Sequence, residues 1–157
     1  MKFRIAAVIL AAAGIAGLCF PLRAQESSPS PQPPPATSPA QSSRSVRDGV
    51  YTVQQARRGA ARSGLCAPCH GADLEGDTAP PLTGAVFTEK WNGKTVGELF
   101  EIISKDMPND DPGSLSLRQS ADYLAYILLA NDLPAGKAEL PAETEVLSQI
   151  RFEASKP

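Results

Sequence analysis

The sequence has few of the side chains on which most metal and catalytic sites depend. Its 157 residues include one histidine, three cysteines and two methionines. A single histidine excludes multi-histidine metal sites and leaves at most one imidazole for any catalytic triad. The formal charge is −2, so the chain also lacks the basic excess that binding to a phosphate backbone requires, and we expect no nucleic-acid partner. Any functional chemistry must come from a small set of side chains.

Long apolar runs are also scarce, and the one at the start of the chain is typical of an export signal. Lys2 and Arg4 precede an apolar run over Ile5–Phe20, and the small Ala24 suits a cleavage position. This run is shorter than the ~20 residues that a membrane-spanning helix needs. We therefore assign residues 1–24 to a cleaved signal peptide of a bacterial periplasmic protein, with a retained membrane anchor as the alternative.

Cleavage after Ala24 makes the chain more acidic. It removes three of the 15 basic residues and none of the 17 acidic ones, which changes the formal charge from −2 to −5. Residues 25–45 follow, and they consist mainly of Ser, Pro, Gln, Ala and Thr with almost no apolar residue to bury. Such a segment cannot recover its ordering entropy, so we expect a disordered linker. A tether to a membrane or to a partner subunit is the alternative role.

Residues 46–141 lack any alternating strand pattern and predict an all-α domain. Three Ser/Thr-x-x-Glu/Gln capping boxes each precede residues with helical apolar periodicity. The boxes begin at Thr52, Thr95 and Ser116, and the helices that follow are expected to end near Ser63, Lys105 and Asn131. Three main helices should therefore form the domain.

Two further segments complete the domain organisation. The chain between His70 and Lys94 is rich in Gly and Pro, which predicts a loop. Residues 142–157 contain Val146, Leu147 and Ile150 among polar residues. We expect them to form a short amphipathic extension that packs on the domain.

The strongest motif is Cys66-Ala67-Pro68-Cys69-His70. C-x-x-C-H is the spacing for covalent attachment of a c-type haem. Two thiols one helical turn apart reach the two vinyl groups of one porphyrin, and the adjacent imidazole then lies beneath the iron as its proximal ligand. We therefore predict one haem c, attached through Cys66 and Cys69 and ligated by His70.

Three other functions of this motif compete with haem attachment. A thioredoxin-like redox pair would follow a strand, whereas residues 57–64 predict the end of a helix and a turn. A structural zinc site needs four ligands, and the mature chain offers only Cys66, Cys69 and His70 before carboxylates are used. A plain disulfide would leave His70 without a role.

Met107 is the predicted second axial ligand. Once Met1 leaves with the signal peptide, Met107 is the only thioether in the chain. A lone methionine can simply fill a gap in a core, but the polar stretch over residues 105–110 favours a loop that lays one side chain on a haem. A His/Met iron has a raised reduction potential and suits one-electron transfer.

The order of these parts resembles that of the monohaem class I cytochromes c. The similarity covers about residues 46–141 and rests on the C-x-x-C-H-G motif, the Pro80-Pro81-Leu82-Thr83-Gly84 segment, Phe87, Trp91, Met107-Pro108 and the last helix. The resemblance implies an all-α class I cytochrome c fold, with three main helices and loops around one covalently bound haem and a short C-terminal extension.

The resemblance also implies roles for individual residues. Pro80 is similar in position to the proline whose carbonyl accepts the N–H of the proximal imidazole. Trp91 resembles the tryptophan that packs near the haem and bonds a propionate, with a core aromatic as the alternative. Gly59 resembles the small residue at the crossing of the first and last helices, with Tyr123 or Tyr126 as its aromatic partner.

Within this family, the chain looks most like periplasmic cytochromes that serve quinoprotein-type dehydrogenases. The resemblance implies a non-enzymatic one-electron carrier that takes electrons from a dehydrogenase and passes them to an oxidase or another cytochrome. Two alternatives keep the haem. One is a subunit tethered in a membrane or dehydrogenase complex, where the membrane is a partner only if the signal is retained. The other is a catalytic or ligand-sensing haem protein with a labile sixth ligand.

The cleavage prediction is tested by N-terminal sequencing of the exported protein. We expect the chain to start at Gln25, because Ala24 is the small residue that follows the apolar run. A protein that still starts at Met1 would contradict cleavage and favour the anchored alternative.

Overall fold

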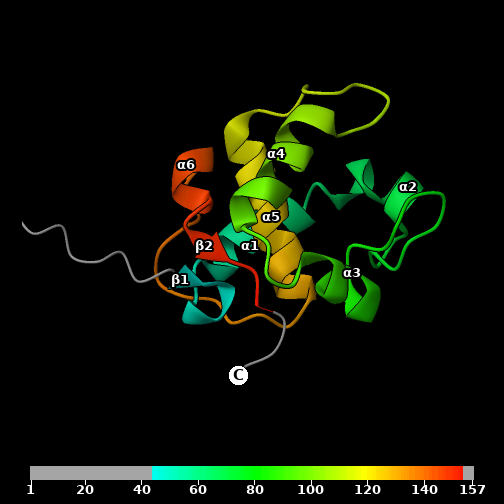
Figure 1. The fold of residues 1–157 in the computed structure, drawn as a ribbon. Coiled ribbons are helices and arrows are strands. Elements are labelled where there is room, and N and C mark those ends of the chain that lie inside the picture. Colours follow the sequence, from blue (N-terminus) through cyan, green and yellow to red (C-terminus); the bar gives the residue numbers. More distant parts are fainter. Residues whose placement is uncertain (1–43, 154–157) are drawn as a thin grey trace, which may run out of the picture. The chain divides into compact units, whose positions relative to one another are not determined.

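The structure is a computed structural model that describes residues 44–153; the predicted signal peptide, most of the predicted linker and residues 154–157 lie outside this range. The described part contains six α-helices, two 3-10 helices and two strands of two residues each, so it is mostly helical, as the sequence predicted (Figure 1). Between residues 44 and 153, no helix is both long enough and apolar enough to cross a membrane.

Two of the three predicted capping boxes are present. Helix α4 (Val96–Asp106) starts after Thr95, whose hydroxyl accepts from the Glu98 N–H while the Glu98 carboxylate accepts from the Thr95 N–H. Helix α5 (Leu117–Ala130) starts in the same way at Ser116, with Gln119 as the reciprocal partner. Because each box satisfies two amide donors that a helix leaves free, both start points were readable from the sequence.

The first helix, α1 (Val53–Ala60), differs from its prediction in two ways. The Thr52 hydroxyl accepts from the Gln55 N–H, but the Gln55 side chain does not reach back to Thr52. It is buried and binds the backbone of Leu140 in both directions, at 3.0 and 2.8 Å. The helix also ends at Ala60 rather than near Ser63, and a 3-10 helix over Ser63–Leu65 follows. A tertiary contact therefore replaces half of the predicted box.

Helices α1 and α5 cross at Gly59. A Cβ atom at this position would overlap the backbone carbonyl of Asp122 and lie 2.9 Å from the Tyr126 Cβ. Of the two tyrosines that the resemblance offered, Tyr126 is thus the one beside Gly59. Next to the crossing, Arg58 donates to both oxygens of the buried Asp122 carboxylate, with the shortest contact at 2.8 Å. Hydrogen bonds to Glu139 and Asp122 raise the pKa of Arg58, so the guanidinium keeps its charge beside this contact.

A fourth helix of at least eight residues forms where the sequence predicted a loop. Helix α3 spans Gly84–Trp91, and the loop prediction for this part of the chain is wrong. Phe87 and Trp91 lie four residues apart on one face and are 2 % and 5 % exposed. The Asn131 side chain accepts from the Gly84 N–H and donates to the Leu82 carbonyl. Burial of two aromatic rings and a distant side-chain cap outweigh the weak local propensity.

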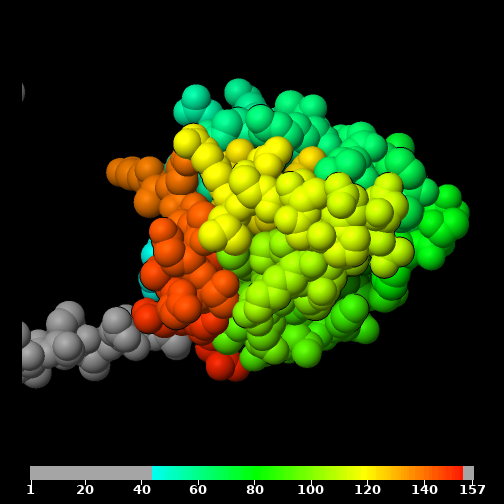
Figure 2. Space-filling model, turned by 90° about the horizontal axis from the view of Figure 1, so that it is seen from above, coloured from blue at the N-terminus to red at the C-terminus, as the bar shows by residue number. Residues whose placement is uncertain are grey.

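The C-terminal segment, residues 144–153, packs on the helices. It contains the short helix α6 (Thr144–Leu147) and strand β2 (Ile150–Arg151), which pairs in parallel with strand β1 (Arg44–Ser45). Leu147, Ile150 and Phe152 are at most 1 % exposed. Figure 2 shows this segment, coloured orange to red, against the green surface that α4 contributes. Arg44 and Ser45, which the sequence placed in the linker, thus take part in the fold.

Substitution of Gly59 by Ala tests the crossing. In the interior of an ordinary helix, replacing Gly by Ala stabilises the helix by about 1 kcal/mol. Here we expect the free energy of unfolding to fall by about 1–3 kcal/mol, because the added methyl group overlaps rigid backbone. The matched control is Gln54→Ala at an exposed position of the same helix, which should change stability by less than about 0.5 kcal/mol. Urea denaturation measures both, and equal stability of the two variants would contradict the close contact.

Candidate functional site

The C-x-x-C-H motif forms one turn of helix, α2 (Ala67–His70). The His70 N–H donates to the Cys66 carbonyl at 2.9 Å, and Gly71 ends the turn with a φ of +85°. Cys66 and Cys69, three residues apart on this turn, lie on the same face, and both line one cavity. Burial raises the pKa of the Cys66 thiol, whereas Cys69 is exposed. The motif therefore presents two thiols to one cavity from a single turn.

The His70 ring is held in one orientation by a hydrogen bond to Pro80. The imidazole is 9 % exposed, and its Nδ1 lies 2.7 Å from the Pro80 carbonyl oxygen. A carbonyl oxygen can only accept, so Nδ1 carries the hydrogen in this bond. In the neutral imidazole, Nε2 then carries the lone pair and can act as a ligand for a metal. His70 lines the cavity, and Pro80 occupies the position that the sequence analysis expected.

The loop that carries Pro80 is tied to the motif by backbone hydrogen bonds. The Ala79 N–H donates to the Cys69 carbonyl at 2.9 Å, and the Gly76 N–H donates to the His70 carbonyl at 2.6 Å. Leu74, 1 % exposed, anchors the middle of the loop in the core. Because these contacts join the loop to the turn that bears His70, the Pro80 carbonyl is fixed relative to the imidazole.

A cavity of about 680 Å³ lies beside the motif, within the range that protein pockets use for small molecules and cofactors. Its walls are mainly apolar and come from the motif, the following loop, α3, α4 and α5. All six residues that the sequence predicted as cofactor or metal ligands line it: Cys66, Cys69, His70, Pro80, Trp91 and Met107. One cavity thus brings together side chains that span 42 positions of the sequence, from 66 to 107.

Met107 reaches the cavity from the end of α4. It is the residue that caps this helix, with extended backbone (φ −113°, ψ 150°), and its side chain is half-buried. Leu99, Ile102 and Ile103 of the same helix also line the cavity, as expected for residues three and four apart on one helix face. The thioether therefore stands at the edge of an apolar wall.

Trp91 lies at the end of α3 with two ammonium groups near its ring. The nitrogens of Lys90 and Lys94 are each 5.8 Å from the ring centroid, within cation–π distance. Lys90 also lines the cavity, and its charge gives this mostly apolar site one cationic side. Lys90 could not be predicted from the sequence, since a lysine in a segment expected to be a loop belongs to no distinguishing pattern.

Helix α5 supplies two cavity residues that were not predicted to lie there. Tyr123 was a candidate for the helix crossing, and Ile127 had no predicted role. Tyr123 and Ile127 line the cavity from one face of this helix. The Tyr123 hydroxyl donates to the Arg62 carbonyl at 2.9 Å, and burial raises its pKa. The i, i+4 spacing of these two residues is a usable signal, but the same spacing is typical of any core-facing helix.

No group of three or more His, Cys, Asp or Glu side chains within residues 44–153 is arranged to hold a metal ion.

The chain matches no protein-family model, and comparison with curated proteins and with solved structures yields no match either.

A pair of tyrosine substitutions tests the contact between α5 and the start of the motif. In Tyr123→Phe, loss of the hydrogen bond to the Arg62 carbonyl should lower the free energy of unfolding by about 1 kcal/mol. Tyr126 lies on the same helix, and its hydroxyl forms no hydrogen bond to residues 44–153. Tyr126→Phe should therefore lower the free energy of unfolding by less than about 0.5 kcal/mol. Denaturant titration of both variants distinguishes them, and an equal effect would argue against the Tyr123 bond.

Proposed function

We propose that this chain is a monohaem class I cytochrome c that works as a periplasmic one-electron carrier. The observation that carries the proposal is the cavity, on which two thiols, one imidazole and one thioether converge. Those four groups are what a covalently held His/Met haem requires. After the predicted cleavage they are also the only cysteines, histidine and methionine that the chain has.

The residues present fit the cofactor. Cys66 and Cys69 would form the thioether links, and His70 and Met107 would be the axial ligands. A bound c-type haem supplies an iron that alternates between two oxidation states and so carries one electron. The Pro80 carbonyl holds the imidazole in the tautomer that leaves Nε2 free to coordinate.

The chain's own residues also set the environment of the proposed cofactor. Leu99, Ile103 and Ile127 are at most 7 % exposed and form part of the apolar wall, so a bound cofactor would be shielded from water on that side. Exclusion of water disfavours the more highly charged oxidised state and so raises the reduction potential. Lys90 and Trp91 lie where they can meet an anionic substituent of the cofactor.

The order of the helices supports the proposed family. Helices α1 and α5, the first and last long helices of the described residues, cross closely at Gly59. The motif follows α1 after a short 3-10 helix, and Met107 follows α4. This order of parts is the one that the resemblance to class I cytochromes c implied.

The partners we propose are a dehydrogenase as donor and an oxidase or another cytochrome as acceptor. Cys69 and Pro68, at the edge of the cavity, are exposed, so a partner can approach the proposed haem from this side. A subunit tethered in a complex would use the same site. A catalytic or ligand-sensing haem protein would instead require that Met107 leave the iron easily.

The role of Met107 separates these functions. In the exported wild-type protein, we expect covalently bound haem and a methionine-to-iron charge-transfer band in the oxidised state. Met107→Ala should abolish that band, lower the reduction potential and let carbon monoxide bind the reduced protein, because the sixth position is vacated. Absorption spectroscopy and a redox titration measure these changes.

Asn109→Ala is the matched control, since Asn109 lines the cavity from the same loop but offers no iron ligand. It should keep the band and exclude carbon monoxide. Ready binding of carbon monoxide to the reduced wild-type protein at neutral pH, without the band in the oxidised state, would contradict an electron carrier and favour the sensing or catalytic alternative.

A further inference from the structure

Phe152, near the end of the described chain, packs behind the cavity wall. Its side chain is fully buried, and its ring lies 5.7 Å from that of Phe87 at an interplanar angle of 82°. Phe87 in turn lies 6.1 Å from Trp91. Phe87 and Trp91 line the cavity, whereas Phe152 does not. Three aromatic rings thus form a row from the C-terminal segment to the cavity.

The backbone beside Phe152 holds the turn that follows Trp91. The Phe152 N–H donates to the Lys94 carbonyl at 2.8 Å, and the Phe152 carbonyl accepts from the Gly93 N–H at 2.8 Å. Nη2 of Arg151 donates to the Gly93 carbonyl at 2.9 Å. Trp91 is therefore held from two directions, through its ring by Phe87 and through its following turn by residues 151–152.

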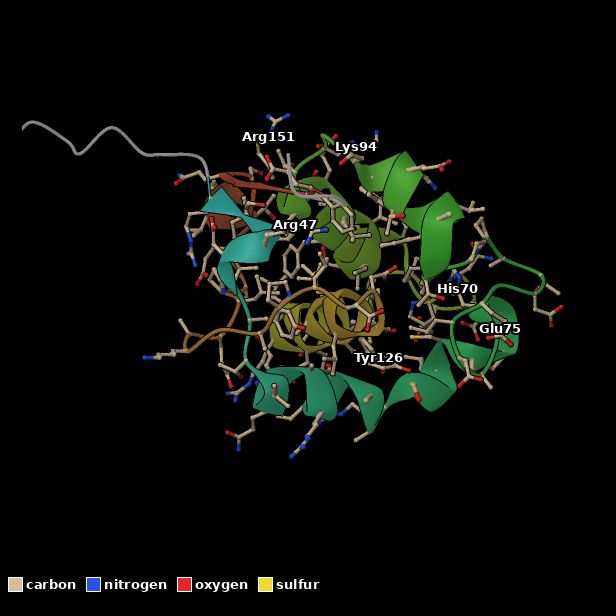
Figure 3. All side chains as sticks on the ribbon, turned by 90° about the horizontal axis from the view of Figure 1, so that it is seen from below. Arg47, His70, Glu75, Lys94, Tyr126 and Arg151 are labelled. Atoms are coloured by element: carbon tan, nitrogen blue, oxygen red, sulfur yellow. The ribbon has the colours of Figure 1, made fainter. Side chains whose placement is uncertain are left out.

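The C-terminal segment is itself fixed by the start of the described chain. Strand β1 pairs with β2, and Nε of Arg47 donates to the Glu153 carbonyl at 3.1 Å. Figure 3 shows Arg47, Lys94 and Arg151 together at one side of the fold and His70 well away from them. The contacts that hold Phe152 are therefore independent of the motif that bears the predicted iron ligand.

We infer that Phe152 is a positioning residue that acts through Phe87 to hold Trp91 against the cavity. An edge-to-face ring contact favours one relative orientation of the two rings, and full burial leaves Phe152 little freedom to move. Loss of this ring opens space behind Phe87, so Phe87 and Trp91 shift and water reaches the cavity. The effect on the reduction potential rests on the proposed function, whereas the effect on Trp91 does not.

Phe152→Ala in the exported, haem-loaded full chain tests the inference. Trp91 is the only tryptophan, so the near-ultraviolet circular dichroism of its indole reports on this position. We expect its fine structure to be lost. At a fixed ambient potential we expect the ratio of reduced to oxidised protein to fall severalfold, because water favours the more highly charged oxidised state.

Leu147→Ala is the matched control. Leu147 lies in the same segment and is equally buried, but it has no place in the aromatic row or the cavity lining. This variant should lose stability in urea while the Trp91 spectrum and the reduced fraction stay unchanged. If Phe152→Ala does not fold, Phe152→Leu keeps an apolar side chain without the ring, and it should still alter the Trp91 spectrum.

Two results would overturn the inference. One is a Trp91 spectrum and a reduced fraction that are unchanged in Phe152→Ala or, where that variant does not fold, in Phe152→Leu. The other is an equal change in Leu147→Ala, which would mean that any loss of buried volume in this segment has the same effect. A wild-type protein without covalent haem would instead contradict the proposed function, and the Trp91 spectra of the variants would still decide the positioning role.

Discussion

The close crossing of α1 and α5 determines where the other cavity residues stand. Gly59 lets the helices approach until the α1 backbone meets the Asp122 carbonyl, and Arg58 neutralises the buried Asp122 carboxylate beside the contact. The motif follows α1 after one 3-10 turn, while α5 presents Tyr123 and Ile127 to the cavity. A larger residue at Gly59 would separate the turn that bears the two thiols from the wall that faces them.

The chemistry of the site depends on how polar groups are satisfied around an apolar space. The Pro80 carbonyl takes the one hydrogen that the neutral His70 imidazole can donate, which leaves the other ring nitrogen available for coordination. The hydroxyl of Tyr123 is satisfied by the Arg62 carbonyl. Since these polar atoms are paired within the protein, the remaining wall can be apolar. Under the proposed function, an apolar wall would raise the reduction potential of the bound iron.

The two ends of the described chain meet far from the motif yet contribute to the same site. Strands β1 and β2 pair, and the backbone of Phe152 forms two hydrogen bonds to the turn after Trp91. A cavity wall at α3 is thus supported by residues some 60 positions away along the chain. This support adds to the burial of Phe87 and Trp91 and to the Asn131 cap. Together they account for a helix whose sequence is short and flanked by glycine and proline.

The sequence by itself determined the features that local chemistry dictates. The boxes at Thr95 and Ser116 predicted where two helices begin, because capping joins residues three apart. The C-x-x-C-H spacing selected two thiols and an imidazole that line one cavity. Pattern alone could not predict α3, the burial of Gln55 against Leu140, or the place of Lys90 at the cavity. Those features were decided only by the tertiary structure, because each depends on burial or hydrogen bonding between residues that are distant in the chain.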